Sequence, residues 1–435
     1  MEPTAALCYG ALAALAIHPD YHLRQEVVAL MGEFWFPVHT AAKQNVMIGL
    51  LRDGQYELAY ARLTEMIEQD DAVDPWVHDI FILVFGRLGF LDEMLLLLLR
   101  RRGVEGSDVD ETMISLLSFA LDVCSQAFHR QGTEFAWTAA VRNSLVQPPD
   151  GVVDNVLATA ARHGDAVLAT EALDMLSKRA WVVVRPFHYE AVAEAFAASG
   201  DVAGVLRILC IMQKNGTRLA RLHTRAVKAA LERSPELIGE AEATLRKLAA
   251  EEALPMGLVA VVVEAIAERQ GSEAAIDLYR DVTGLCGRPA GAATMQDLMV
   301  HSKTGETVRA LARDYVSRVS EGGDPPRGPW VYTELIAACA NAGELDLAFR
   351  FAKQAMGACK TEQQLGWVKP LVEQAAARED GRIWDVVDEI GGMQDRNIRS
   401  MMAQVLRRTT LARKASAMAS ATAKATATAS PDHDA

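Results

Sequence analysis

The sequence predicts an all-α protein, an α-solenoid of about ten stacked helix-turn-helix units. Half of the 435 residues are hydrophobic and only 6% are aromatic, a composition typical of packed helices rather than sheets. Turn residues, mostly glycine, recur at a nearly constant interval, and each separates two stretches with apolar positions at helical spacing. Because each unit of such a fold packs only against its neighbours, this length is compatible with one long array.

Each predicted unit is defined by the turn between its first helix, helix A, and its second, helix B. Glycine suits this turn because the reversing chain must often adopt positive φ. Five residues after the turn, helix B carries a small or apolar residue, such as Ala59 or Ala169, which we expect to be buried against helix A. The predicted turn residues are Gly54, Gly89, Gly132, Gly164, Gly200, Pro235, Gly271, Gly305, Gly343 and Gly381.

Four segments follow from this pattern. Residues 1–39 are expected to form an N-terminal helix pair, and residues 40–394 the repeat array. Residues 395–409 are expected to form a capping helix, and residues 410–435 a disordered tail rich in Ala, Ser and Thr. The first pair has no polar cap, which indicates either a truncated start or a partner that covers this end.

The charge and the cysteines limit the classes of function. The formal charge of −13 repels phosphate over most of the surface, so a nucleic-acid site would have to be local. The apolar runs are too short for a membrane span, which needs about 20 residues. The six cysteines are far apart and lie mostly in apolar helical stretches, so we expect buried thiols in a reducing compartment.

The residues with potential chemistry form no recognisable catalytic motif. His18 and His22 have a spacing that would place both imidazoles on one side of a helix, as metal ligands require. Pro19 and Asp20 favour a turn between them instead, and no third ligand is nearby. We therefore expect no metal, no cofactor, no small-molecule substrate and no enzymatic activity.

Details of the repeat distinguish between two architectures with this period, the tetratricopeptide and the pentatricopeptide repeat. Bulky residues predominate seven positions before the turn, as at Met47 and Ile82, where the first architecture expects a small residue. Several second helices end in Met, as at Met66 and Met212. Residues 40–394 therefore resemble the pentatricopeptide family, in particular its divergent members of fungal mitochondria. The resemblance implies a superhelix of helix pairs and a mitochondrial location, although the Arg-poor start shows no transit peptide; otherwise the protein would be cytoplasmic.

In pentatricopeptide proteins that read single-stranded RNA, each unit recognises one base through a helix A residue and the last residue of the unit. The helix A position is expected ten residues before the turn, where the family has mainly Asn, Thr or Ser. Here it is often acidic, and only Asp74 is a usual last residue, so no regular code emerges. The candidate partner-facing positions are Gln44, Asp79, Asp122, Asp154, Glu190, Arg225 and Thr333.

The C-terminal segment contains the densest cluster of basic residues. Arg407, Arg408, Arg413 and Lys414 are candidate phosphate contacts, or alternatively cations at a helix end and on a solvated tail.

Two functional classes remain open. The first is an RNA-binding factor in mitochondrial RNA metabolism or gene expression, which the family resemblance favours. The second is a protein-binding scaffold, for example an assembly factor for a respiratory complex of the complex I type, which the acidic face suits. The partner is therefore expected to be single-stranded RNA or a protein.

Overall fold

The computed structural model describes residues 3–18, 20–104, 110–319, 329–358 and 361–389, together with residues 396, 399–400, 403–405 and 407–408. These residues form helices joined by short loops and contain no strand, which confirms the all-α prediction. The chain divides into two compact units, Met1–Ser199 and Gly200–Ala435.

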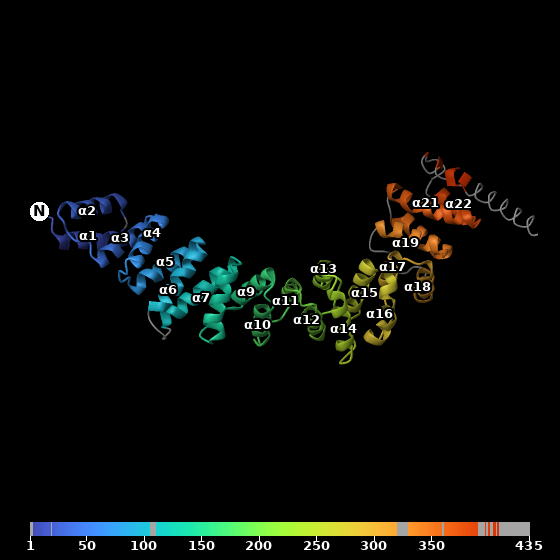
Figure 1. Cartoon of the computed structure of the whole chain (residues 1–435), viewed down its shortest axis with the longest axis horizontal. Helices are drawn as coiled ribbons and strands as arrows, with labels where there is room; N and C mark the ends of the chain where they lie inside the picture. The colour runs from blue at the N-terminus through green and yellow to red at the C-terminus, as the bar shows by residue number, and fades with distance from the viewer. Residues whose placement is uncertain are drawn as a thin grey trace, which may run out of the picture. The chain divides into compact units, whose positions relative to one another are not determined.

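The first unit is a series of helix pairs (Figure 1). Its helices are α1 (Ala5–Ile17), α2 (Tyr21–Glu33), α3 (Thr40–Arg52), α4 (Tyr56–Glu68), α5 (Pro75–Leu88), α6 (Leu91–Val104), α7 (Glu111–Gln126), α8 (Arg130–Ala136), the π-helical η1 (Trp137–Arg142), α9 (Asp150–His163), α10 (Ala166–Ser177) and α11 (Pro186–Ser199). The odd-numbered helices are the A helices, and each of them from α1 to α9 packs against the next A helix as well as its own B helix.

The second unit continues the alternation from α12 onward. Its A helices α13, α15, α17, α19 and α21 pack on one another in order. The helices are α12 (Val202–Lys214), α13 (Arg225–Arg233), α14 (Leu237–Ala249), α15 (Met256–Gln270), α16 (Ser272–Cys286), α17 (Ala292–Val300), α18 (Gly305–Arg318), α19 (Pro329–Ala342), α20 (Leu345–Ala358), α21 (Thr361–Ala377) and α22 (Arg382–Glu389).

Local sequence sets where many of these helices begin. Asp20, Asp110 and Asp165 each accept a hydrogen bond from the backbone N–H three residues later, at 3.0, 2.6 and 3.0 Å. Such a side chain satisfies one of the free donors of the first helical turn. Pro75 occupies the first position of α5, where its missing N–H costs nothing.

The turns between helices A and B confirm six of the ten predicted positions and correct Gly132, Gly305 and Gly381; before α22 the positive φ is at Glu379. Gly89 ends α5 with a φ of 86°. Gly132, by contrast, lies buried inside α8, and the turn that precedes this helix is Phe128, with a φ of 55°. Gly305 is the first residue of α18 rather than the turn before it. Positive φ is found at the predicted turns Gly54, Gly89, Gly164, Gly200, Gly271 and Gly343.

The burial of side chains in the B helices shows which residues are at equivalent positions in the repeats, which the turns alone did not show. Ala59 and Ala169, each three residues after the first residue of its helix, are fully buried as expected. Ile276 and Ala310, predicted at the same place, are half-buried and exposed. Their helices begin earlier than expected, α16 one residue after Gly271 and α18 at Gly305 itself. Counted from these helix starts, the equivalent residues are Ala275 and Val308, and both are buried.

The cysteines match the expectation of buried thiols. Cys8, Cys124, Cys210, Cys286 and Cys339 are all buried and free, whereas Cys359 lies outside the described residues. Burial raises the pKa of Cys124 and of Cys339 to about 12, so both remain protonated near neutral pH.

Candidate partner-binding surface

The predicted partner-facing positions all lie on A helices. In the first unit they are on α3, α5, α7, α9 and α11, and in the second unit on α13 and α19. We call the face of the A helices that carries these positions the A face. The side chains on it differ in burial and in the partners that they contact.

Gln44 does not fit the expectation of a partner-facing residue. Its side chain is only 2% exposed, and its Nε2 donates a hydrogen bond to the carbonyl oxygen of Ala72 at 3.2 Å. It therefore holds the loop before α5 and is not available to a ligand.

Two of the acidic positions lie close to basic side chains from neighbouring helices. Asp79 accepts a hydrogen bond from Nε of Arg101 at 2.9 Å, and Arg101 is only 2% exposed. An Asp154 carboxylate oxygen lies 3.2 Å from Nε2 of His188 on α11. Arg101 therefore offsets the negative charge of Asp79, and the sequence gave no indication of this contact.

Asp122 was placed from the wrong turn. Ten residues before the true turn at Phe128 is Ser118, one helical turn earlier on α7. Asp122 itself is half-buried and accepts a hydrogen bond from Nε2 of Gln126 at 2.7 Å. Glu190 is also half-buried, on α11. The predicted carboxylate row is therefore less regular and less exposed than the sequence suggested.

The second unit has a different set of groups at these positions. Arg225 is exposed at the first residue of α13. Thr333 is half-buried on α19, with its hydroxyl close to Gly366 of α21, where an added Cβ would lie 3.2 Å from it.

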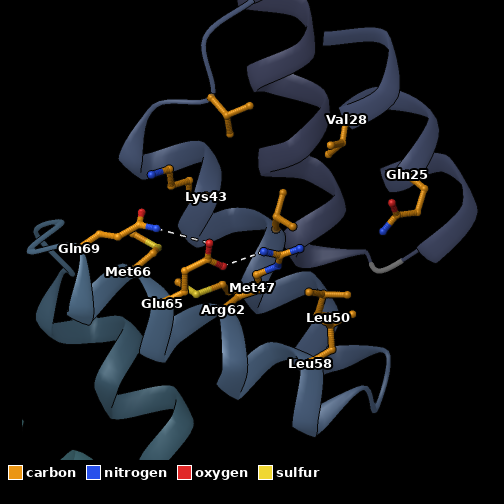
Figure 2. A pocket seen from close by; sticks show the side chains of 12 residues that line it. Gln25, Val28, Lys43, Met47, Leu50, Leu58, Arg62, Glu65, Met66 and Gln69 are labelled. Carbon is orange, nitrogen blue, oxygen red and sulfur yellow. Dashed lines mark hydrogen bonds and ion pairs between the residues drawn. The ribbon is translucent and has the colours of Figure 1, made fainter. Parts of the chain in front are cut away.

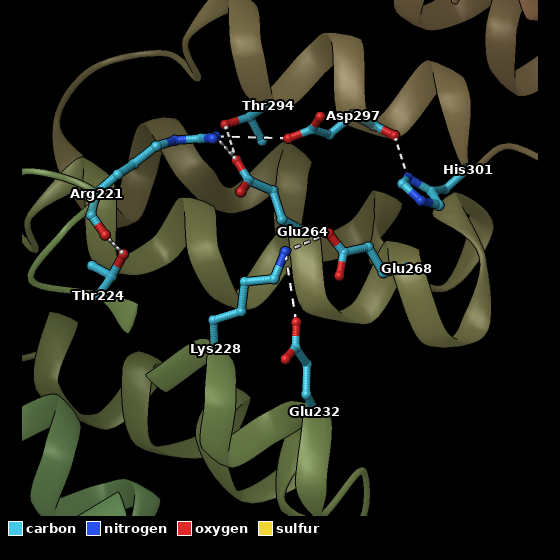
Figure 3. Close-up of polar contacts among 9 residues, drawn as sticks. All are labelled: Arg221, Thr224, Lys228, Glu232, Glu264, Glu268, Thr294, Asp297 and His301. Atoms are coloured by element: carbon cyan, nitrogen blue, oxygen red, sulfur yellow. Dashed lines mark hydrogen bonds and ion pairs between the residues drawn. The ribbon is translucent and has the colours of Figure 1, made fainter. Parts of the chain in front are cut away.

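An ionic network that the sequence did not indicate joins α13, α15 and α17 (Figure 3). Glu264 on α15 is 5% exposed and lies 2.6 Å from Nη2 of Arg221, which belongs to the loop before α13. The same guanidinium lies 3.6 Å from Asp297 on α17. Thr294 donates a hydrogen bond to Glu264 at 3.2 Å. Two carboxyl groups thus share one arginine.

Burial dominates the protonation of these two carboxyl groups. It raises the pKa of Glu264 to about 7 and that of Asp297 to about 6, although Arg221 acts in the opposite direction. Beside them, Lys228 lies 2.8 Å from Glu268 and 3.8 Å from Glu232. This part of the A face therefore changes its charge close to neutral pH.

Exposed aromatic side chains flank three of the predicted positions. Trp76, Phe187 and Trp330 are 43%, 50% and 68% exposed. Each is the second residue of its A helix, follows a proline, and precedes a predicted position, Asp79, Glu190 or Thr333, by three residues. Residues three apart on a helix are neighbours on one face, so each ring lies one turn from a predicted position. The repeated Pro-aromatic pair was a signal that the sequence analysis missed.

An apolar groove lies between α2, α3 and α4 (Figure 2). Its volume is about 260 Å³. Glu65 on its rim accepts hydrogen bonds from Arg62 at 2.7 Å and from Gln69 at 3.4 Å, and both of these residues also line the groove. Its apolar lining consists of Val28, Val38, Val46, Met47, Leu50, Leu58 and Met66.

The remaining predicted sites are only partly described. Arg407 and Arg408 are exposed helical residues, whereas Arg413 and Lys414 lie outside the described residues.

His18 follows the last residue of α1 and His22 lies within α2, so the pair does not share a helix. The described residues contain no group of three or more His, Cys, Asp or Glu side chains that could hold a metal ion. Within the same residues, no helix is long and apolar enough to cross a membrane.

Comparison with known proteins supports the repeat assignment. Residues 150–282 match a family model described as pentatricopeptide repeat-containing protein. The pentatricopeptide repeat protein PPR10 from maize is similar in structure, with 13% identity over 96% of this chain and 63% of that chain, and a TM-score of 0.35. PPR10 in complex with an 18-nt psaJ RNA element gives 16% identity over 92% and 61%, with a TM-score of 0.34.

This chain therefore spans less than two thirds of the length of the proteins in those structures. No curated protein sequence matches the chain. The resemblance indicated by the turn residues is confirmed over residues 150–282, and the chain is a pentatricopeptide-like helical-repeat protein.

Proposed function

We propose that this protein binds single-stranded RNA along its A face, without enzymatic activity, and acts in mitochondrial RNA metabolism or gene expression. The observation that carries the proposal is the set of exposed rings at Trp76, Phe187 and Trp330, each one helical turn from a predicted recognition position. Every base has a π face, so aromatic side chains bind single strands by stacking, at about 1–3 kcal/mol per base.

The pairing of the carboxylates makes this face more compatible with RNA than the sequence indicated. Asp79 is neutralised by Arg101, and Asp154 lies against His188. Because most recognition positions lack the usual Asn, Thr or Ser, we expect binding through stacking and backbone contacts with little base preference.

The mitochondrial location rests on the resemblance to divergent fungal members of the pentatricopeptide family. Fractionation of cells expressing the full chain, with protease protection of the isolated mitochondria, tests it. Recovery of the protein in the cytosolic fraction alone would remove this part of the proposal.

A matched pair of variants tests the RNA-binding surface. Replacing both Trp76 and Phe187 by Ala should weaken the binding of a 20-nucleotide single-stranded RNA at least tenfold in fluorescence anisotropy, because two bases then have no ring on which to stack. Trp384→Ala is the control: Trp384 has the same 43% exposure as Trp76 but lies on the B helix α22. Equal reductions in the two proteins, or no binding by the parent chain, would contradict the proposal.

A protein partner is the second candidate, as in an assembly factor for a respiratory complex of the complex I type. The apolar groove between α2, α3 and α4 and the net charge of −13 favour it. Leu58→Asp places a charge in the groove without touching the aromatic rings. Loss of proteins crosslinked to the chain in isolated mitochondria, with RNA crosslinking unchanged, would support this candidate.

A further inference from the structure

We propose that a cavity in the second unit, lined by Arg218 and Arg288, holds a backbone phosphate of the bound nucleic acid. The cavity lies where α12, α14 and α16 end and has a volume of about 460 Å³. The assignment to RNA rests on the proposed function. The lining consists of Gln213, Gly216, Thr217, Arg218, Leu219, Ala253, Leu254, Pro255, Met256, Gly257, Cys286 and Arg288.

Backbone contacts fix the loops that form this cavity. The N–H of Leu254 donates a hydrogen bond to the carbonyl oxygen of Leu285 at 2.8 Å, which ties the loop after α14 to the end of α16. An added Cβ at Gly257 would lie 3.7 Å from the carbonyl oxygen of Leu219, so the loop after α12 runs along the first turn of α15. Gly287, with a φ of 67°, ends α16 immediately before Arg288. The two arginines therefore project from loops that are held together.

The charge in the cavity is uncompensated. Arg218 and Arg288 are exposed, and neither forms an ion pair with any carboxylate in the part of the chain that the structure describes. The lining contains no Asp or Glu. Glu252, adjacent in sequence to Ala253 of the lining, is held by Lys214 at 2.8 Å. Two guanidiniums without a carboxylate partner favour an anion, and their planar donors suit phosphate oxygens.

Neutral hydrogen-bonding groups in the cavity also favour an anion. Thr217 and Gln213 add a hydroxyl and an amide to the lining, and both can donate to an oxygen. Met256 and Gly257 form the first turn of α15, whose positive dipole end adds to the attraction. The loops of the cavity lead into the A helices α13, α15 and α17, at the same end of the A helices where Trp330 begins α19 in this unit. A phosphate there suits a strand whose bases stack on such rings.

The salt dependence of RNA binding tests the cavity. In the full chain, replacing Arg218 and Arg288 by Gln should reduce the slope of log affinity against log salt by about 0.7 for each phosphate that the protein no longer neutralises. The control replaces Arg280 and Arg309 by Gln, which changes the net charge equally on exposed residues of α16 and α18 outside the cavity. A smaller slope in the cavity variant than in the control supports the inference, and equal slopes overturn it while RNA binding itself stands.

A second measurement separates this inference from the proposed function. Phenylglyoxal labels accessible arginines, and inorganic pyrophosphate should protect Arg218 and Arg288 but not Arg280, as read by peptide mass spectrometry. If the parent chain binds no RNA, the proposed function fails. Protection by pyrophosphate would then still support a site that binds a free phosphate compound. Labelling of both arginines in the presence of pyrophosphate would overturn the phosphate site.

Discussion

The A face handles its acidic groups differently in the two units. In the first unit Arg101 lies 2.9 Å from Asp79 and 3.7 Å from Asp110, whose side chains are 18% and 46% exposed. In the second unit Glu264 and Asp297 share Arg221, and burial raises the pKa of both carboxyl groups. Two acids share one arginine in both units, but in the second unit these acids are more deeply buried, and this burial makes the charge there depend on pH near neutrality.

The largest expected effect comes from removing the closer of the two carboxylates around Arg101 in the first unit. Asp79→Ala leaves the nearly buried Arg101 without its closest carboxylate, so we expect the free energy of unfolding to fall by about 3 kcal/mol. Urea denaturation followed by circular dichroism measures it. Asp154→Ala is the comparison, because the carboxylate is 43% exposed and His188 can be neutral, so the loss should stay below about 1 kcal/mol. Similar losses of unfolding free energy in the two variants would contradict the expected difference between Asp79 and Asp154.

Packing inside a repeat gives the next effect. Ala169→Trp overfills the contact between α10 and α9, where Ala169 is fully buried, and should destabilise the protein by about 1–3 kcal/mol. Val167→Trp on the same helix is the control, because Val167 is 64% exposed. Thermal melting curves that coincide for the two variants would show that the register of α10 is misplaced.

The burial of Glu264 in the second unit predicts that stability depends on pH. Since the folded state raises the pKa of Glu264 from 4.5 to about 7, it binds more protons than the unfolded state between these values. The stabilisation is complete below the unfolded pKa and is lost as pH rises through about 7. Glu264→Gln should flatten this decline, which we expect to be on the order of 2 kcal/mol between pH 5 and 8.

Urea titrations at pH 5, 6, 7 and 8 measure this decline. Glu232→Gln, which alters an exposed acid near Lys228, should leave the pH profile as it is in the parent chain. A profile for Glu264→Gln that parallels that of the parent would remove Glu264 as its cause.

The smallest effect concerns the charge on the A face itself. Asp154→Asn removes one partly exposed carboxylate, so RNA binding should strengthen by at most about 1 kcal/mol, and less at high salt. Anisotropy titrations at two salt concentrations measure it. If a protein binds there instead, association with that protein should become slower. The opposite signs make this single change informative about the class of partner.

The fold was readable from the sequence because its signals are local. Turn glycines such as Gly89 and the helical spacing of apolar residues act over a few residues, and they identified the repeat. In α7 the register failed because a residue other than glycine made the turn: Phe128 adopts positive φ, so Gly132 was mistaken for it. The error displaced the expected recognition position by one helical turn, from Ser118 to Asp122.

The candidate site was less readable because its contacts join residues far apart in sequence. Asp79 and Arg101 are 22 positions apart, and Arg221 and Glu264 are 43 positions apart. No pattern within a single repeat specifies these pairs. The aromatic rings are a different case, since Pro75-Trp76 and Pro186-Phe187 are visible in the sequence. Their place one helical turn from a predicted position follows only once the helix starts are known.

Ultraviolet crosslinking of the full chain to single-stranded RNA, with the crosslinked peptides identified by mass spectrometry, tests the central claim most directly. We expect crosslinks at Trp76, Phe187 and Trp330, at the starts of α5, α11 and α19. Crosslinks confined to exposed aromatic side chains on B helices, such as Trp384, or the absence of any RNA crosslink, would contradict it.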